Sequence, residues 1–275
     1  MKAQGQKYLA ELFGTFILVF VGCSVPVALF KLSHGQGGTL IYVWEFAPFA
    51  FGFALLAGLY AFGETSGGHF NPAVSLAMFL DRRLSVMDLV GYWLFQFVGA
   101  VIAAAVLVLA FDKASVKSAA TVPGFGKGAA VVFEIVMTAI FVLVILQVTK
   151  SGVFGTTALV AIPLTLLAIH VAAIPISGSS VNPARTLGPA LIGNKWTAEW
   201  VYFLGPAAGA ILGWLVHTVV VEGDIDLRDN VAAVADEVEG EIHGGGAAVS
   251  DDQPDPAAPE WGTETDSESS EDDKT

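Results

Sequence analysis

Two Asn-Pro-Ala triplets stand in an otherwise apolar chain, at residues 71–73 and 182–184. Asparagine is a favoured helix N-cap, and proline in the next position fixes φ where a helix has no N–H partner to lose. Each triplet therefore predicts the start of a helix, over about 71–80 and 182–192. The positive end of such a helix offers N–H donors to a neutral, oxygen-bearing solute and repels cations, and the asparagine amide offers further donors. The residues concerned are Asn71, Pro72, Ala73, Asn182, Pro183 and Ala184.

The composition indicates a membrane protein around these triplets. The chain is 54% hydrophobic and 14% charged, whereas ordinary globular proteins have about 25% charged residues. A helix needs about 20 apolar residues to cross a ~30 Å hydrocarbon core. A soluble protein with so many buried helices would need more polar helix faces than this chain supplies. We expect six membrane spans, at residues 8–30, 40–62, 87–111, 128–149, 155–176 and 197–221. Aromatic residues near their ends, Tyr92 and Tyr202 among them, are expected at the membrane interface.

Charge is distributed unevenly along the chain. Residues 1–221 carry 8 acidic and 11 basic side chains, whereas residues 222–275 carry 18 acidic and 2 basic ones, for a net charge of −13. We therefore expect a transmembrane domain over 1–221 and an acidic, disordered tail over 222–275, with at most a transient helix at 229–242. Neither part has the strong positive charge that binding to nucleic acid would require.

The single cysteine excludes an internal disulfide, and we expect no metal and no cofactor.

The transmembrane domain is an internal repeat, over about 5–111 and 127–221. Glu11 and Thr15 in the first span recur as Glu134 and Thr138 in the fourth, four residues apart on one helix face. Each half holds three spans, and three is odd, so the second half must be inverted in the membrane. The fold class is therefore an all-α membrane protein: six transmembrane helices plus two re-entrant half-helices in an inverted three-plus-three repeat.

The half-helices then enter from opposite faces, and their N-termini meet near the midplane. A ten-residue helix rises about 15 Å, half of a bilayer, so the irregular backbone before each triplet must be buried or line a cavity. We expect Glu11 and Glu134 to accept backbone N–H groups of these loops rather than to relay protons. If these loops line a cavity, the carbonyl groups expected to face it are those of Gly67, Gly68, His69, Ser179 and Ser180. His34, His217 and His243 lie near span ends or in the tail and are expected at the surface.

These motifs resemble the major intrinsic protein (aquaporin) family over about residues 5–221. The resemblance is carried by AELFGT at 10–15, SGGHFNPAV at 66–74 and SGSSVNPAR at 177–185. It implies an aquaporin-like right-handed bundle. It also implies a homotetramer in the plasma membrane, with a separate pore through each protomer that passes solute passively.

The resemblance further implies a constriction of four residues. They are an aromatic twenty residues before the first triplet's asparagine, the residues twelve and three before the second asparagine, and the arginine after the second triplet. Here these positions hold Phe51, His170, Ser179 and Arg185. Histidine at the second position resembles the water-selective subgroup of prokaryotic type, whereas glycerol facilitators usually have a small residue there. Phe203 departs from the tryptophan that is more common in the water-selective pattern.

Together these features predict a passive water channel, driven by osmotic gradients, that excludes protons and ions. One alternative is a channel for glycerol or another small neutral solute. A coupled secondary transporter also uses inverted repeats and broken helices, but it would need an ion-binding cluster where this chain has asparagines. The sequence has no motif for nucleophilic catalysis, phosphate binding or metal ligation, so we do not expect an enzyme. Basic residues number six on the side of the termini and five on the other, which slightly favours cytoplasmic termini.

Overall fold

The computed structural model describes residues 3–34, 40–150, 157–223 and 228–243. Over these ranges the chain is helical and has no β-strand. Six helices are long and apolar enough to cross a membrane. They are α1 (Gln4–Leu32), α2 (Leu40–Ser66), α4 (Val86–Ala110), α6 (Lys127–Lys150), α7 (Ala158–Ser177) and α9 (Trp200–Val216), which continues as the π-helix η3 (His217–Val221). The six predicted spans are confirmed.

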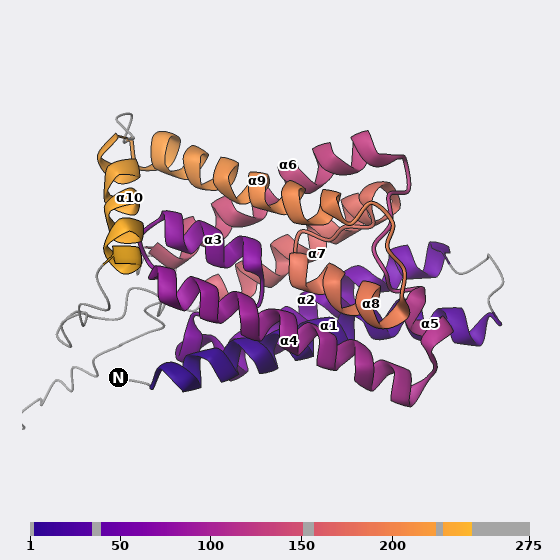
Figure 1. Ribbon diagram of the computed structural model, residues 1–275. Helices are drawn as coiled ribbons and strands as arrows, with labels where there is room; N and C mark the ends of the chain where they lie inside the picture. Colours follow the sequence, from indigo (N-terminus) through magenta and orange to yellow (C-terminus); the bar gives the residue numbers. More distant parts are fainter. Residues whose placement is uncertain (1–2, 35–39, 151–156, 224–227, 244–275) are drawn as a thin grey trace, which may run out of the picture.

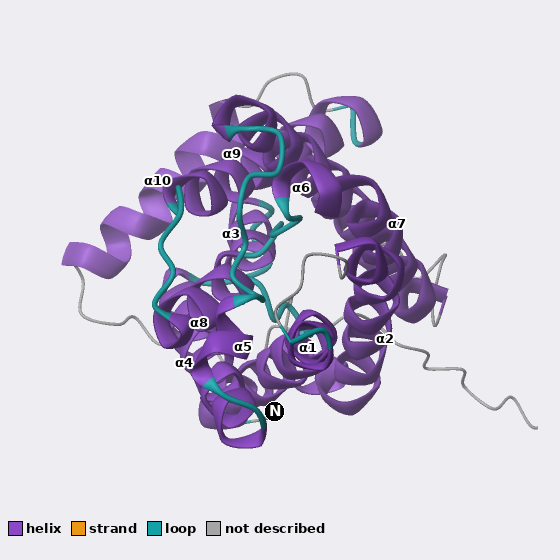
Figure 2. Cartoon of the chain, turned by 90° about the vertical axis from the view of Figure 1, so that its right-hand side faces the viewer, coloured by secondary structure: helices purple, strands orange, loops and turns teal. Residues whose placement is uncertain are grey.

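The six long helices form a ring, which Figure 2 shows roughly end-on. In the first half α1 packs against α2 and α4, and in the second half α6 packs against α7 and α9 in the equivalent way. Contact between α2 and α7 joins the two halves on one side of the ring. Two short helices, α3 (Pro72–Leu80) and α8 (Pro183–Gly193), fill the other side between α4 and α9.

The two short helices begin where the triplets predict. Asn71 has extended backbone angles, and its Oδ1 accepts the N–H of Ala73 at 2.9 Å. Asn182 does the same for Ala184 at 2.9 Å and for Arg185 at 3.2 Å. From these starts α3 and α8 run toward opposite ends of the bundle (Figure 1). We call the end at which α1 begins and η3 ends the terminal face, and the other end the opposite face.

Two elements lie outside the repeat. The five-residue helix α5 (Lys113–Lys117) follows α4 and was not predicted. In the acidic segment, α10 (Arg228–His243) lies across the terminal face (Figure 1), and its Val234 and Val238 pack against the apolar core of the bundle. This helix covers the range for which the sequence predicts at most a transient helix. The rest of the acidic tail, 244–275, lies outside the described residues.

The outer surface of the ring is apolar, as a lipid-facing surface must be. Leu9, Phe53, Leu94 and Leu204 are among the many large apolar side chains exposed there.

The predicted interfacial position of Tyr92 and Tyr202 is wrong, because both side chains are completely buried. Their hydroxyl groups donate to the carbonyl oxygens of Ser66 and Ser177, each at 2.7 Å. These carbonyls belong to the last residues of α2 and α7, which have no partner within their own helices. The predicted surface position of His217 is also wrong, because its side chain is fully buried.

Glycines let the helices of each half approach closely. A Cβ atom on Gly99 of α4 would lie 2.3 Å from the carbonyl oxygen of Leu12 in α1. In the second half, a Cβ on Gly209 of α9 would lie 2.5 Å from the carbonyl oxygen of Ile135 in α6. Both neighbours are backbone atoms, which cannot move aside as a flexible side chain would. Glycine at these two positions therefore fixes the distance between the packed helices.

We predict that Gly99→Ala destabilises the protein by about 1–3 kcal/mol, the usual cost of overpacking. Gly128→Ala is the matched control, because a Cβ there meets nothing within 4 Å. Thermal unfolding in detergent, followed by circular dichroism, measures both. Equal midpoints for the two variants would contradict the close approach of α1 and α4.

Candidate functional site

A buried carboxylate holds the loop that leads into α3. Oε1 of Glu11 accepts the Ser66 hydroxyl at 2.6 Å and the N–H of His69 at 2.9 Å. Oε2 accepts the N–H of Phe70 at 2.6 Å and the side-chain amide of Gln96 at 2.7 Å. Glu11 has no exposed surface. Its negative charge is thus surrounded by four donors, which offset the cost of burying it.

The second half repeats this arrangement. Oε1 of Glu134 accepts the Ser177 hydroxyl at 2.7 Å and the N–H of Ser180 at 2.9 Å, and Oε2 accepts the N–H of Val181 at 2.7 Å. Glu134 is also fully buried. Each carboxylate therefore holds two consecutive backbone N–H groups of the loop in its own half.

The loops need such support because their backbone is strained. Phe70 has φ of 48° and Val181 has φ of 44°, in the left-handed region that β-branched and bulky residues rarely occupy. Such a conformation costs about 1–3 kcal/mol per residue and persists only where its surroundings impose it. Both residues donate their N–H to a glutamate, and both carbonyls also have a partner.

That partner is the asparagine of the other half. Nδ2 of Asn71 donates to the carbonyl oxygen of Val181 at 2.8 Å, and Nδ2 of Asn182 donates to that of Phe70 at 2.9 Å. Each asparagine thus caps its own half-helix with its oxygen and holds the opposite loop with its nitrogen. The two half-helix N-termini are joined here. Sequence reasoning missed this bond, since its partners lie more than a hundred residues apart.

Two adjoining cavities run along the bundle past these asparagines. The first contains Phe51, Asn71, His170, Asn182 and Arg185 in its lining. The second extends toward the terminal face. Leu55, His69 and Phe141 line both, so the cavities meet at these residues.

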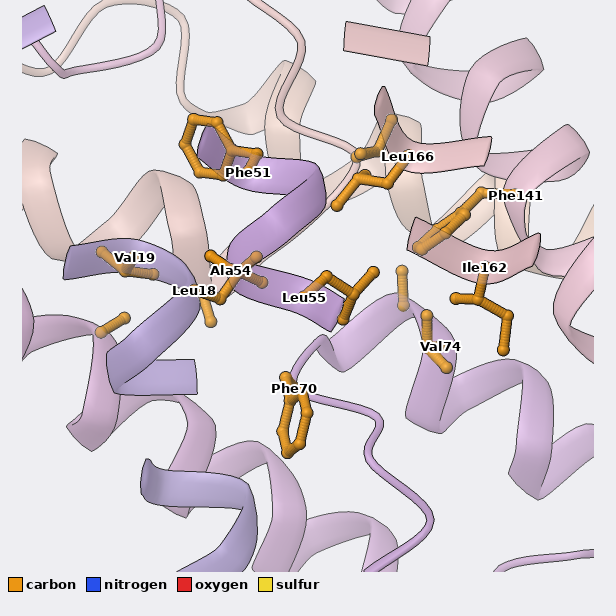
Figure 3. Packing of buried hydrophobic residues seen from close by; sticks show 14 of the residues in the cluster. Leu18, Val19, Phe51, Ala54, Leu55, Phe70, Val74, Phe141, Ile162 and Leu166 are labelled. Atoms are coloured by element: carbon orange, nitrogen blue, oxygen red, sulfur yellow. The ribbon is translucent and has the colours of Figure 1, made fainter. Parts of the chain in front are cut away.

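The walls of the cavities are largely apolar. Figure 3 shows Leu55, Phe141, Ile162 and Leu166, from three different helices, turned toward a common space that Val74 of α3 also borders. Of the five predicted carbonyl residues, four belong to the linings: Gly67, Gly68, His69 and Ser180. Ser179 lines neither cavity, and Val181, which was not predicted, lines the first.

The four predicted constriction residues lie together and are buried. The rings of Phe51 and His170 have centroids 4.8 Å apart, and the guanidinium carbon of Arg185 lies 5.0 Å from the centre of the Phe51 ring. Ser179 Oγ lies 3.4 Å from Nδ1 of His170. Phe51 is seated on Gly22, where a Cβ would come within 2.2 Å of its ring. An aromatic ring, an imidazole and a guanidinium therefore lie together in the lining of the first cavity.

Arg185 is held by a segment that follows α5. Its Nη1 donates to the carbonyl oxygen of Ala119 at 3.2 Å and to Thr121 Oγ1 at 2.5 Å. Neither contact was predicted, because no motif marks this segment. Nε of Arg185 and Nε2 of His170 have no hydrogen-bond partner in the described part of the chain. These two buried nitrogens are suited to meet a polar solute.

The start of α5 is fixed by an ion pair. Nζ of Lys31, at the end of α1, lies 2.6 Å from Oδ2 of Asp112, the N-cap of α5. The bond from Lys31 and a second from the N–H of Ser115 lower the pKa of Asp112 to about 2. The pair is partly exposed, so it directs the chain more than it stabilises the fold.

This geometry defines an integral membrane protein in which two half-helices meet inside a ring of six spans. The major intrinsic protein family model matches residues 2–217. The chain belongs to this family of membrane channels.

Relatives within the family carry different names. A glycerol uptake facilitator protein-like protein of Lactiplantibacillus plantarum is 40% identical over 215 residues, covering 75% of this chain and 94% of its own. Aquaporin Z of Brucella melitensis is 36% identical over 225 residues, covering 76% of this chain and 95% of its own. The solved aquaglyceroporin of Plasmodium falciparum has the same fold, with a TM-score of 0.69 at 20% identity, over 82% of this chain and all of that one.

We predict that Glu134→Gln loosens the loop before α8. Glutamine offers one acceptor oxygen where the carboxylate offers two, so one of the two loop N–H groups loses a charged hydrogen bond worth about 1.5–3 kcal/mol. Hydrogen exchange measured by mass spectrometry should become faster at Ser180 and Val181. Glu45→Gln, an exposed control in α2, should leave this exchange unchanged, and equal exchange in the two variants would refute the role of Glu134.

Proposed function

We propose that the protein is a passive water channel, driven by osmotic gradients, that excludes protons and ions. The observation that carries the proposal is the constriction, where Phe51, His170 and Arg185 face one another in a buried cavity. His170 occupies room that a bulkier solute would need, and Arg185 adds a fixed positive charge. A small neutral molecule with hydrogen-bonding capacity fits this opening best.

The paired asparagines provide a mechanism for keeping protons out. Each side-chain amide has two N–H groups, and one of them is engaged with the opposite loop. The second N–H of Asn71 and of Asn182 donates to a passing water. A water that accepts both bonds turns its own hydrogens outward, so neighbouring waters are oriented oppositely on the two sides. The half-helix dipoles add a positive barrier at the same point.

The remaining wall makes passage fast. Leu18, Leu55, Phe141 and Leu166 offer no hydrogen bonds to the solute, so water is not retained between the polar positions. The carbonyl groups of Gly67, Gly68, His69 and Ser180 act as acceptors along the line. Glu11 and Glu134 act as structural supports for these loops, since their oxygens are already occupied by donors.

Glycerol is the second candidate. A relative named as a glycerol uptake facilitator is 40% identical, which supports a channel for small neutral solutes. His170 favours water over glycerol because its buried ring, next to Phe51, takes up room in the constriction that glycerol would need.

We further propose a homotetramer in the plasma membrane, with cytoplasmic termini and one pore per protomer. The apolar outer surface is compatible with contacts to both lipid and neighbouring protomers. The channel domain spans 1–221, and α10 of the acidic segment lies on the terminal face.

The proposal is tested by stopped-flow light scattering of proteoliposomes, with an impermeant osmolyte and then with glycerol. We expect fast water flow and negligible glycerol uptake in the wild type. His170→Ala should raise glycerol uptake about tenfold or more, because relief of a steric contact in a small pocket is worth roughly 1–3 kcal/mol. His34→Asn removes an exposed histidine and is the control, since asparagine tolerates its positive φ of 51°. Fast glycerol uptake by the wild type would overturn the water-selective assignment.

Asn71→Asp tests the exclusion of charge. Aspartate caps a helix as well as asparagine does, so α3 is retained, but a negative charge replaces the amide donors at the junction. We expect a larger proton and cation leak, measured with a pH-sensitive dye in proteoliposomes under an imposed potential. Asn194→Asp makes the same substitution at an exposed position after α8 and should not leak. An unchanged leak in Asn71→Asp would count against the mechanism.

A further inference from the structure

A cluster of polar side chains lies at the terminal face, separate from the constriction formed around Arg185. Asp81 caps the C-terminal end of α3, His217 begins η3, and Glu222 follows η3. Carboxylate oxygens of Asp81 and Glu222 and a ring nitrogen of His217 all lie within 4.8 Å of one another. The end of α3 and the two ends of η3, which are far apart in the sequence, thus bring two carboxylates and one imidazole to a single point.

The burial of these side chains suits a binding site. The side chain of His217 is fully buried, that of Asp81 is 7% exposed and that of Glu222 is 22% exposed. Ligand atoms on one Zn²⁺ ion lie about 3.3 Å apart, as follows from tetrahedral bonds of about 2.0–2.1 Å. The partly exposed Glu222 side chain has the freedom to close the remaining distance.

The imidazole of His217 has unmet hydrogen-bonding capacity. Neither ring nitrogen makes a hydrogen bond within the described residues. Nδ1 lies 3.3 Å from Oε1 of Glu222, so it is directed at the cluster. A buried polar atom without a partner destabilises the folded state. An ion held between His217 and the carboxylates would remove this cost at Nδ1.

Two cations already contact the carboxylates. Nε of Arg83 lies 2.8 Å from Oδ2 of Asp81, and Arg83 is also held by Thr149 and the carbonyl of Leu146. Lys150 pairs with Oε1 of Glu222, and its side chain is 49% exposed. Arg83 is therefore fixed, whereas Lys150 can leave Glu222 for water. A divalent ion would take the place of Lys150 and leave the ion pair of Arg83 and Asp81 intact.

We propose that Asp81, His217 and Glu222 bind a divalent transition metal ion of the Zn²⁺ type, which displaces Lys150 from Glu222. The imidazole ligand selects such an ion over Mg²⁺ or Ca²⁺, which prefer oxygen ligands only.

This site differs from the expectation, based on sequence, that the chain binds no metal. The ion would join the end of α3 to the end of α9. Since Arg83 bonds Thr149, which lines the second cavity, the ion would stiffen that end of the cavity.

The test is calorimetric titration of the full chain in detergent with Zn²⁺, after removal of any purification tag. Excess Mg²⁺ is present to occupy weak oxygen sites on the acidic tail. We expect one Zn²⁺ site per chain in the wild type and in the control His34→Asn. His217→Gln should abolish this site, and Glu222→Gln should weaken it tenfold or more.

Lys150→Met separates metal binding from a merely structural role. Removing the competing ammonium should strengthen Zn²⁺ binding several-fold, because an ion pair of this exposure is worth up to about 1 kcal/mol. Glu222→Gln and Lys150→Met are thus expected to shift the Zn²⁺ affinity in opposite directions. This pair of variants tests metal binding even where His217→Gln fails to fold. Equal titrations for the wild type, Glu222→Gln and Lys150→Met would overturn the proposal.

Discussion

Irregular backbone inside a membrane protein must find all of its hydrogen bonds within the protein, because the hydrocarbon offers none. Two loops of this chain meet that constraint at the centre of the bundle, and each does so with one buried glutamate. Glu11 and Glu134 each accept two consecutive N–H groups, and the second residue of each pair, Phe70 or Val181, has strained backbone angles. Without these carboxylates the half-helices would have no fixed starting point, and the cavities beside them would lose their polar lining.

The asparagine bonds extend this support across the two halves. Because each asparagine holds the carbonyl of the opposite loop, the position of one half-helix depends on the other. Within each half, the surrounding helices approach as closely as Gly99 and Gly209 allow. A channel that must hold several side chains in a fixed opening benefits from a framework in which neither half can move alone.

The framework is symmetric, but the constriction is not. Arg185 follows the second triplet, whereas Val74 occupies the equivalent position after the first. His170 likewise belongs to the second half, and Thr121, which accepts a bond from Arg185, lies in the segment that joins the halves. The charged and polar side chains of the constriction are therefore concentrated near one end of the cavities. The inverted repeat thus supplies two similar supports, and a few side chains that differ between the halves supply the selectivity.

The sequence by itself determined the six spans, the start of both half-helices and the inverted repeat. These follow from apolar length, N-cap chemistry and the counting of spans, all of which are local or nearly local. A family resemblance placed Phe51, His170, Ser179 and Arg185 at one point, and they do lie together.

Only the tertiary structure decided which distant groups meet. The structure buries Tyr92 and His217, which the sequence places at the surface. The bonds from Tyr92 to Ser66, from Arg185 to Thr121 and from each asparagine to the opposite loop all join residues far apart in the chain. A tyrosine near a helix end has the same local pattern whether it faces lipid headgroups or a buried carbonyl. The choice is made by the carbonyl that packing brings within reach, because a buried acceptor without a donor is too costly to leave.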